Sequence, residues 1–260
     1  MRADLVALPL AALLTALPLA ARAQQQQAPP QMATVVVPVV GSVNGPGNVR
    51  WKTDVELRND QPSEATVSLV LPSAPDQPAI ITTIGPGETV NFTDVVNEAF
   101  GIEAALSPLL VQTMGRRSVL VKATAYGVSG TDVLKPEPIT INYGPTYFPI
   151  RILPGLTFNA EFRTNIGLAN LGERDTEFVL ALQRLPGRNL AVTRVAVRAN
   201  TLVHVGLQSF FPLVTDGGDF TVVVECPSPE TYIYASVIEN ATSTATFVQP
   251  SIGLADDGDR

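Results

Sequence analysis

The sequence predicts an all-β fold built from two similar units in tandem, and three observations support this. Between Trp51 and Asn59 the residues Trp, Thr, Val, Leu and Asn alternate with charged ones, as in a strand with one buried face. Residues 162–170 repeat this alternation 111 positions later. Twenty-two prolines and 19 glycines are spread along the 260 residues, which is typical of many short strands joined by tight turns.

The first 23 residues are expected to form a secretory signal peptide. Residues 5–20 are almost entirely apolar, and Ala21-Arg22-Ala23 supplies the small residues that signal peptidase reads. The run is shorter than the roughly 20 residues of a membrane helix, and two prolines interrupt it. An uncleaved anchor is the alternative. We therefore expect a secreted protein, periplasmic or extracellular, whose residues 24–33 form a polar linker.

The composition excludes several classes of protein. Hydrophobic residues make up 45% and charged residues 16%, which excludes a disordered chain. The net charge of −7 becomes −8 without residues 1–23, so long-range repulsion disfavours nucleic acid and anionic membranes as partners. Cys226 is the only cysteine, which excludes an intrachain disulfide. It follows an apolar run, and this favours a buried side chain over a reactive thiol.

The first unit is expected over residues 34–148. Pro38 interrupts its first strand, and because proline cannot donate to a ladder, this strand is expected at a sheet edge. A short helix over 95–100 is expected to begin after Thr93 or Asp94 and to end at Gly101. Residues 109–113 and 119–125 are expected to pair as a hairpin. The expected strands are 34–43, 51–59, 66–71, 79–84, 89–92, 109–113, 119–125 and 139–143.

The second unit is expected over residues 149–252, with an acidic tail at 253–260. Pro149 matches Pro38 at a spacing of 111, and the spacing drifts by only two residues along the unit. A period of about 112 residues is the size of a domain and not of a solenoid repeat. About seven short strands in each unit predict two tandem β-sandwiches of immunoglobulin-like type.

A longer pattern resembles a known group of proteins. It runs Pro-Val-Val-Gly-Ser-Val, then Trp-Lys-Thr-Asp-Val-Glu-Leu-Arg-Asn, then Gly-Pro-Gly-Glu-Thr before an apolar strand. It is similar to uncharacterised secreted bacterial proteins with repeated β-sandwich units that carry a Trp-x-Thr-Asp-x-x-Leu-x-Asn strand. The resemblance covers most of residues 34–250, although the second unit has Phe162 and Asn165 in place of Trp and Asp. It implies a fold and brings no activity or site.

Six positions shared by the two units are expected to be structural. The aromatic pair is placed in equivalent core positions. The threonine pair is expected to bond to the backbone, and the asparagine pair to hold the turn after its strand. These positions are Trp51, Thr53, Asn59, Phe162, Thr164 and Asn170.

Two groups of residues are candidates for a catalytic role. His204 is the only histidine, and a Ser-His-Asp mechanism would need a nucleophile beside it. It aligns with Asn91 of the first unit, which favours an outward polar position. Asp54 and Glu56 lie about 7 Å apart along a strand, a spacing compatible with glycosidase chemistry. Flanking cations favour surface ion pairs instead. No catalytic residue is therefore assigned.

No metal or cofactor is expected either. One histidine and one cysteine cannot build a zinc site without carboxylates. Asp216 and Asp219 flank two glycines and could offer oxygen ligands to calcium, but Asp-Gly is first of all a turn signal.

The sequence thus favours a secreted, non-enzymatic structural or interaction module with an unknown protein or glycan partner. A carbohydrate-binding module is the first alternative, with exposed tyrosines near 143–148 and 232–234 as its platform. A hydrolase is the second alternative.

Overall fold

The computed structural model describes residues 32–115, 119–143, 148–184, 188–225 and 228–252. They form an all-β structure of antiparallel sheets with two single-turn α-helices. The expected signal peptide 1–23, the acidic tail 253–260 and Cys226 lie outside the described residues, as does the linker 24–33 up to residue 31. Residues 32 and 33 of that linker already belong to the first strand.

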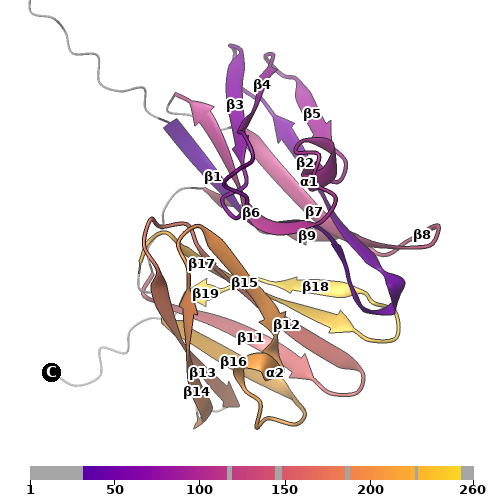
Figure 1. Cartoon of the computed structure of the whole chain (residues 1–260), viewed down its shortest axis with the longest axis vertical. Coiled ribbons are helices and arrows are strands. Elements are labelled where there is room, and N and C mark those ends of the chain that lie inside the picture. Colours follow the sequence, from indigo (N-terminus) through magenta and orange to yellow (C-terminus); the bar gives the residue numbers. More distant parts are fainter. Residues whose placement is uncertain (1–31, 116–118, 144–147, 185–187, 226–227, 253–260) are drawn as a thin grey trace, which may run out of the picture. The chain divides into compact units, whose positions relative to one another are not determined.

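The first ten strands, which we call the N-terminal set, form two sheet layers around β1 (Figure 1). Their bounds, with the helices, are β1 (Met32–Asn44), η1 (Pro46–Asn48), β2 (Arg50–Arg58), β3 (Ala65–Val70), β4 (Ile80–Ile84), β5 (Thr89–Phe92), α1 (Val95–Glu98), β6 (Ala105–Met114), β7 (Leu120–Ser129), β8 (Asp132–Val133), β9 (Glu137–Ile139) and β10 (Asn142–Tyr143). One layer has the order β4-β3-β6-β1-β10. In the other, β2 lies between β5 and β7, and β7 also pairs with β8 and β9.

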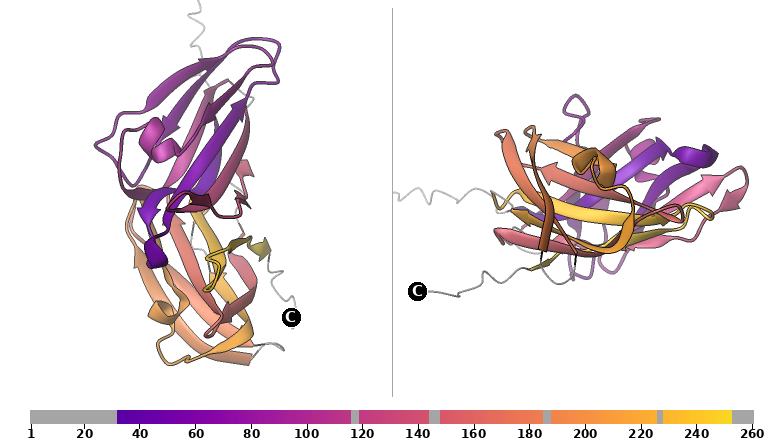
Figure 2. Two further views of the ribbon diagram at one scale, coloured as in Figure 1. Left: turned by 90° about the vertical axis from the view of Figure 1, so that its right-hand side faces the viewer. Right: turned by 90° about the horizontal axis from the view of Figure 1, so that it is seen from below.

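The remaining strands, the C-terminal set, form two separate sheets (Figure 2). Their bounds are β11 (Ile150–Phe158), β12 (Phe162–Asn170), β13 (Thr176–Arg184), β14 (Arg188–Val197), β15 (Thr201–Gly206), α2 (Leu207–Phe210), β16 (Gly217–Glu225), β17 (Thr231–Glu239), β18 (Ala245–Val248) and β19 (Ser251–Ile252). The five-stranded sheet has the order β14-β13-β16-β11-β19. The four-stranded sheet has the order β15-β12-β17-β18.

The two sets pair their strands in the same order. The path β4-β3-β6-β1-β10 corresponds to β14-β13-β16-β11-β19, and β5-β2-β7-β9 corresponds to β15-β12-β17-β18. Among the described residues, each strand pair lies within one set or the other. The described residues nevertheless belong to one compact unit, because contacts also join the two sets.

Each set has its own core, filled from both of its sheet layers. In the N-terminal set Leu57 of β2 and Leu69 of β3 are fully buried in one cluster. In the C-terminal set Leu168 of β12 and Leu180 of β13 hold the matching places. Burying each such side chain stabilises the fold by about 1.5–3 kcal/mol. The period-two pattern of the sequence therefore does mark the buried faces.

The expectation that the strand with Pro38 lies at a sheet edge is wrong. This strand, β1, pairs along most of its length with β6 and also with β10 and β2. Pro38 is tolerated because it lies in a bulge between Val37 and Val40, where the ladder is interrupted. Pro154 lies in the corresponding bulge of β11, between Leu153 and Leu156. By strand register, then, Pro154 and not Pro149 occupies the place of Pro38.

The expected hairpin between 109–113 and 119–125 is also wrong, although both segments are strands. β6 pairs with β1 and β3, whereas β7 pairs with β2 in the other layer. Both strands bury alternate apolar residues in the same core, from opposite layers. Sequence alternation shows that a strand has a buried face but not to which layer the strand belongs. The short helix forms as α1, and Gly101 with φ of 67° follows it as expected. Asp94 precedes α1 without a side-chain capping bond.

Candidate functional site

Residues of both sets line a partly open cavity of about 140 Å³, which we call the junction cavity. Its wall is mainly apolar and includes three aromatic residues, Trp51, Tyr234 and Phe247. His204 and Lys52 are among the few polar residues that line it. A largely apolar cavity with a few convergent polar groups is the usual form of a small-molecule site.

A glycine lies between His204 and Tyr234, two of the residues that line the junction cavity. Gly167 of β12 lies opposite His204 of β15 and opposite Tyr234 of β17. A Cβ at position 167 would stand 2.1 Å from Cε1 of Tyr234, so the phenol ring lies directly against this glycine. Across it the hydroxyl of Tyr234 meets Nδ1 of His204 at 2.8 Å. The missing side chain is what allows the two rings to meet.

Three rings are stacked beside the cavity. The ring of Tyr234 stacks on that of His204 with centroids 5.6 Å apart, and on that of Phe247 at 5.2 Å. The corresponding row of the N-terminal set is polar, with Asn91 opposite Glu56 and Glu56 opposite Lys122. The ring stack is thus specific to the C-terminal set.

Burial keeps His204 neutral. Desolvation lowers the pKa of its imidazole from 6.5 to about 4, and burial raises the pKa of the Tyr234 hydroxyl, which stays protonated. The strand register agrees with the expected alignment, because His204 lies opposite Gly167 as Asn91 lies opposite Glu56. The ring is part-buried and lines the cavity, however, so the position is not an exposed one. Its Nδ1 bonds to a phenol and not to a nucleophilic serine or cysteine.

The buried imidazole predicts a loss of stability in acid. The unfolded chain, with a histidine pKa near 6.5, binds a proton more readily than the folded chain does. The stabilisation is therefore complete above about pH 6.5 and is lost as the pH falls towards about 4. Partial exposure of the ring reduces the effect to roughly 2 kcal/mol.

Urea unfolding of the wild type and of His204→Gln at about pH 7 and about pH 4.5 measures this effect. The difference between the two proteins removes the contribution of the carboxylates, which also titrate in this range. The wild type should lose more stability than the variant on acidification. Equal losses would contradict the assignment.

The expected core positions of the aromatic pair are corrected by the structure. Trp51 and Phe162 are half-buried, and neither belongs to a core cluster. The indole of Trp51 lies on Gly45, where a Cβ would stand 2.7 Å from Nε1. Phe162 follows a turn in which Oδ1 of Asn159 accepts the backbone N–H of Phe162 at 2.8 Å. Trp51 instead lines the junction cavity.

Thr53 and Thr164 are buried and both bond to the backbone, one hydroxyl as acceptor and the other as donor. Thr53 accepts the N–H of Gly41 at 3.0 Å, and Thr164 donates to the carbonyl of Thr157 at 2.6 Å. Both bonds join a strand to the preceding one in the chain.

The asparagine pair is buried and does more than hold a turn. Nδ2 of Asn59 donates to the carbonyl of Ser63 at 2.8 Å, inside the turn, and to that of Ile84 at 2.9 Å. Ile84 ends β4 in the other layer, so the amide ties the two layers together. Asn170 repeats this with the carbonyls of Arg174 and Val197, at 2.8 and 3.1 Å.

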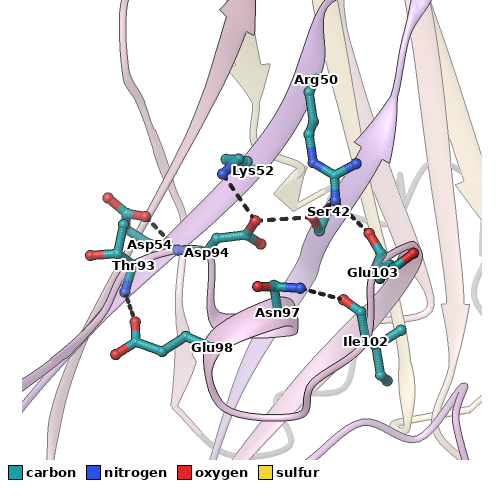
Figure 3. Close-up of polar contacts among 10 residues, drawn as sticks. All are labelled: Ser42, Arg50, Lys52, Asp54, Thr93, Asp94, Asn97, Glu98, Ile102 and Glu103. Carbon is teal, nitrogen blue, oxygen red and sulfur yellow. Dashed lines mark hydrogen bonds and ion pairs between the residues drawn. The ribbon is translucent and has the colours of Figure 1, made fainter.

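A polar network surrounds the buried Asp94 (Figure 3). Through Lys52 it reaches the junction cavity. Asp94 Oδ2 accepts the hydroxyl of Ser42 at 3.0 Å and lies 3.3 Å from Nζ of Lys52, a residue that lines the cavity. Arg50 donates to Ser42 at 2.8 Å. Asp94 adopts a left-handed conformation with φ of 53°, and its backbone N–H donates to Asp54 at 2.8 Å. These contacts hold the charge of Lys52 in place.

Neither carboxylate considered for glycosidase chemistry is left unpaired. Glu56 forms an ion pair with Lys122 at 2.8 Å. Asp54 accepts the backbone of Asp94, and burial together with a hydrogen bond to Asp54 raises the pKa of Tyr126 to about 12. The expected ion pairs involved the flanking cations of the same strand, Lys52 and Arg58. In the structure Glu56 instead pairs with a lysine of β7, and Asp54 with the backbone of the residue before α1.

The calcium candidates are exposed at the start of β16. Asp219 has φ of 55°, as turn residues often do. Within the described ranges, no group of three or more His, Cys, Asp or Glu side chains is placed to hold a metal ion.

The tyrosines expected to form a sugar platform are not exposed where the structure describes them. Tyr232 and Tyr234 are buried, at 7% and 1% exposure. Tyr232 lies in a small apolar cluster with Val36 and Ala169, which joins the two strand sets. The guanidinium of Arg151 lies 5.9 Å from its ring centre. Tyr147 lies outside the described residues.

The outer face of the five-stranded sheet carries a second candidate site, an apolar row. In register, Val192 lies opposite Ala181, Ala181 opposite Val223, and Val223 opposite Ile152. Val192 is 58% exposed and the other three are half-buried. Neighbours on these strands such as Leu180 fill the core, so the four residues point outward. We call them the outer row.

Comparison of the chain with protein-family models, with curated proteins and with solved structures found no match. Over the part of the chain that the structure describes, no helix has the length and apolar character needed to span a bilayer.

Proposed function

We propose that this protein is a secreted, non-enzymatic interaction module made of two tandem immunoglobulin-like β-sandwiches, residues 34–148 and 149–252. The identical order of strand pairing in the two sets supports the repeat. So does the pair of buried asparagines, Asn59 and Asn170, which bridge equivalent layers. The apolar run before Ala23 supports secretion.

One observation carries the interaction role: part of this apolar row, at Val36 and Leu110, is covered in the N-terminal set, whereas Val192 of the outer row is 58% exposed. In the N-terminal set the register places Val70 opposite Leu110 and Leu110 opposite Val36, as Ala181, Val223 and Ile152 are placed in the outer row. Val36 is only 3% exposed, because it packs with residues of the C-terminal set.

The covering residues indicate the kind of partner. Ala169 and Tyr232, opposite each other on β12 and β17, lie over the covered row together with Leu171 and Leu202. They come from the end of a β-sheet and present small and apolar side chains. A protein surface of this type fits the open outer row as well, so we propose a protein partner over a glycan.

Site-specific photo-crosslinking tests this function in cells that export the protein. A photoreactive residue at Val192 or Val223 should give a discrete protein adduct. Leu213 is the matched control, because it is apolar and 94% exposed but lies outside the outer row. Val192→Lys should remove the adduct formed from Val223, since a charge in the row costs desolvation without a partner. Adducts no stronger than those from Leu213 would contradict the proposal.

A further inference from the structure

We propose that the junction cavity is a binding site for an uncharged monocyclic aromatic compound that carries a hydrogen-bond acceptor. This inference goes beyond the interaction role, because the cavity and the outer row share no residue. It rests on the size of the cavity, on the chemistry of its wall and on the compensation of its charges.

The size of the cavity fits one aromatic ring. Its volume of about 140 Å³ is close to that of an engineered apolar cavity of about 150 Å³, which stays dry and binds benzene. Protein interiors are normally packed with few voids larger than a water molecule. The junction cavity is a partly open, mainly apolar pocket with room for one ring, and a ligand of this size would remove its apolar wall from water.

The wall is suited to a flat, apolar ring. Trp51 and Phe247 supply aromatic surface from the two strand sets, and Ala125 and Ala245 leave room where larger side chains would close the space. Ring pairs prefer offset-stacked or edge-on arrangements, which these aromatic side chains allow. Both alanines lie on strands, so their Cβ positions are fixed by the sheets.

The polar part of the wall includes Thr53, Asn165 and Ser236, and beside the ring stack it includes His204, a neutral group. The protonated hydroxyl of Tyr234 lies 2.8 Å from Nδ1 of His204, and we assign the tautomer in which the hydroxyl donates to this nitrogen. In that tautomer Nε2 carries the ring proton, and His204 lines the cavity. A carbonyl or ether oxygen of a ligand is the natural acceptor for this N–H. A pure hydrocarbon would leave this N–H without a hydrogen-bond acceptor.

The charged residues at the cavity are already compensated, which disfavours charged ligands. Lys52 faces Asp94 at 3.3 Å, and Glu137 faces Lys135 at 2.7 Å. An anion or cation entering the apolar space would lose its hydration and find no unpaired opposite charge. The site therefore selects neutral compounds.

Acetophenone is the probe for this site, with toluene and benzoate as matched compounds that lack the acceptor or carry a charge. Ligand-observed NMR and thermal shift on the full chain should show saturable binding of acetophenone. Toluene should bind about fivefold more weakly, as expected for one lost hydrogen bond. Benzoate should not bind. Absence of acetophenone binding, or equal binding of acetophenone and toluene, would overturn the proposal.

Two variants locate the binding. Ala125→Leu fills the cavity and should abolish binding of acetophenone while keeping or raising the melting temperature. Ala245→Leu does the same from the opposite strand set and covers the case in which the first variant fails to fold. Ala196→Leu, at an exposed alanine of β14, is the control and should bind as the wild type does. Unchanged binding in a folded cavity-filling variant would overturn the proposal.

Discussion

Replacing Asn59 by alanine should destabilise the protein by about 4 kcal/mol. The side chain is fully buried, and its amide group donates to three carbonyl oxygens, those of Ser63, Ile84 and Gly85. Its Oδ1 also accepts the N–H of Gln61 at 3.0 Å. Each buried polar group left without a partner costs about 1–3 kcal/mol, so the total exceeds the loss of a single hydrogen bond.

Urea unfolding followed by the fluorescence of Trp51, the single tryptophan, measures this loss in the N-terminal set. Asn91→Ala is the matched control, because Asn91 is an exposed asparagine of the same set, and it should change stability by less than about 0.5 kcal/mol. Asn59→Asp keeps the acceptor and loses the donors, so it should be as damaging as alanine. Equal stability of Asn59→Ala and Asn91→Ala would contradict the bridging role.

The burial of Asn59 can be predicted from the sequence, whereas its hydrogen bond to Ile84 in the other sheet layer cannot. The period-two pattern around it places Asn59 on the same beat as Leu57, and that beat is the buried one. The contact with Ile84 depends on how two sheet layers face each other, which local pattern does not encode. The same limit explains the error at Pro38, since a bulge is a property of the pair of strands and not of one strand.

The ring pair at the junction cavity was also beyond sequence reasoning, although one signal pointed to it. Gly167 stands where the matched strand has Glu56, and an isolated glycine inside a strand often marks a close approach by another group. Which group approaches depends on the register that sets His204 and Tyr234 on either side. The glycine alone therefore predicts a close approach but not the ring pair that makes it.

Gly167→Ala should destabilise the protein by at least about 3 kcal/mol. The new methyl group would stand 2.1 Å from Cε1 and 2.2 Å from Cζ of Tyr234, whose ring is fully buried. Moving the ring aside would disturb its stacking on His204 and Phe247 and its hydrogen bond to His204. Overpacking of a filled interior typically costs about 1–3 kcal/mol, and a clash with a ring held on both sides lies at or above the upper end.

A double-mutant cycle separates this clash from a loss of backbone freedom at the glycine. In the double variant Gly167→Ala/Tyr234→Leu the smaller leucine side chain leaves room for the methyl group. The loss of stability in the double variant should therefore be clearly smaller than the sum of the losses in the two single variants. If only backbone freedom at position 167 mattered, Gly167→Ala alone would be neutral or stabilising, and its effect would be the same with tyrosine or leucine at position 234. Gly218→Ala in β16 is the matched control, because a Cβ there meets nothing closer than 3.6 Å. The coupling between positions 167 and 234 thus measures how strongly the ring stack depends on the missing side chain.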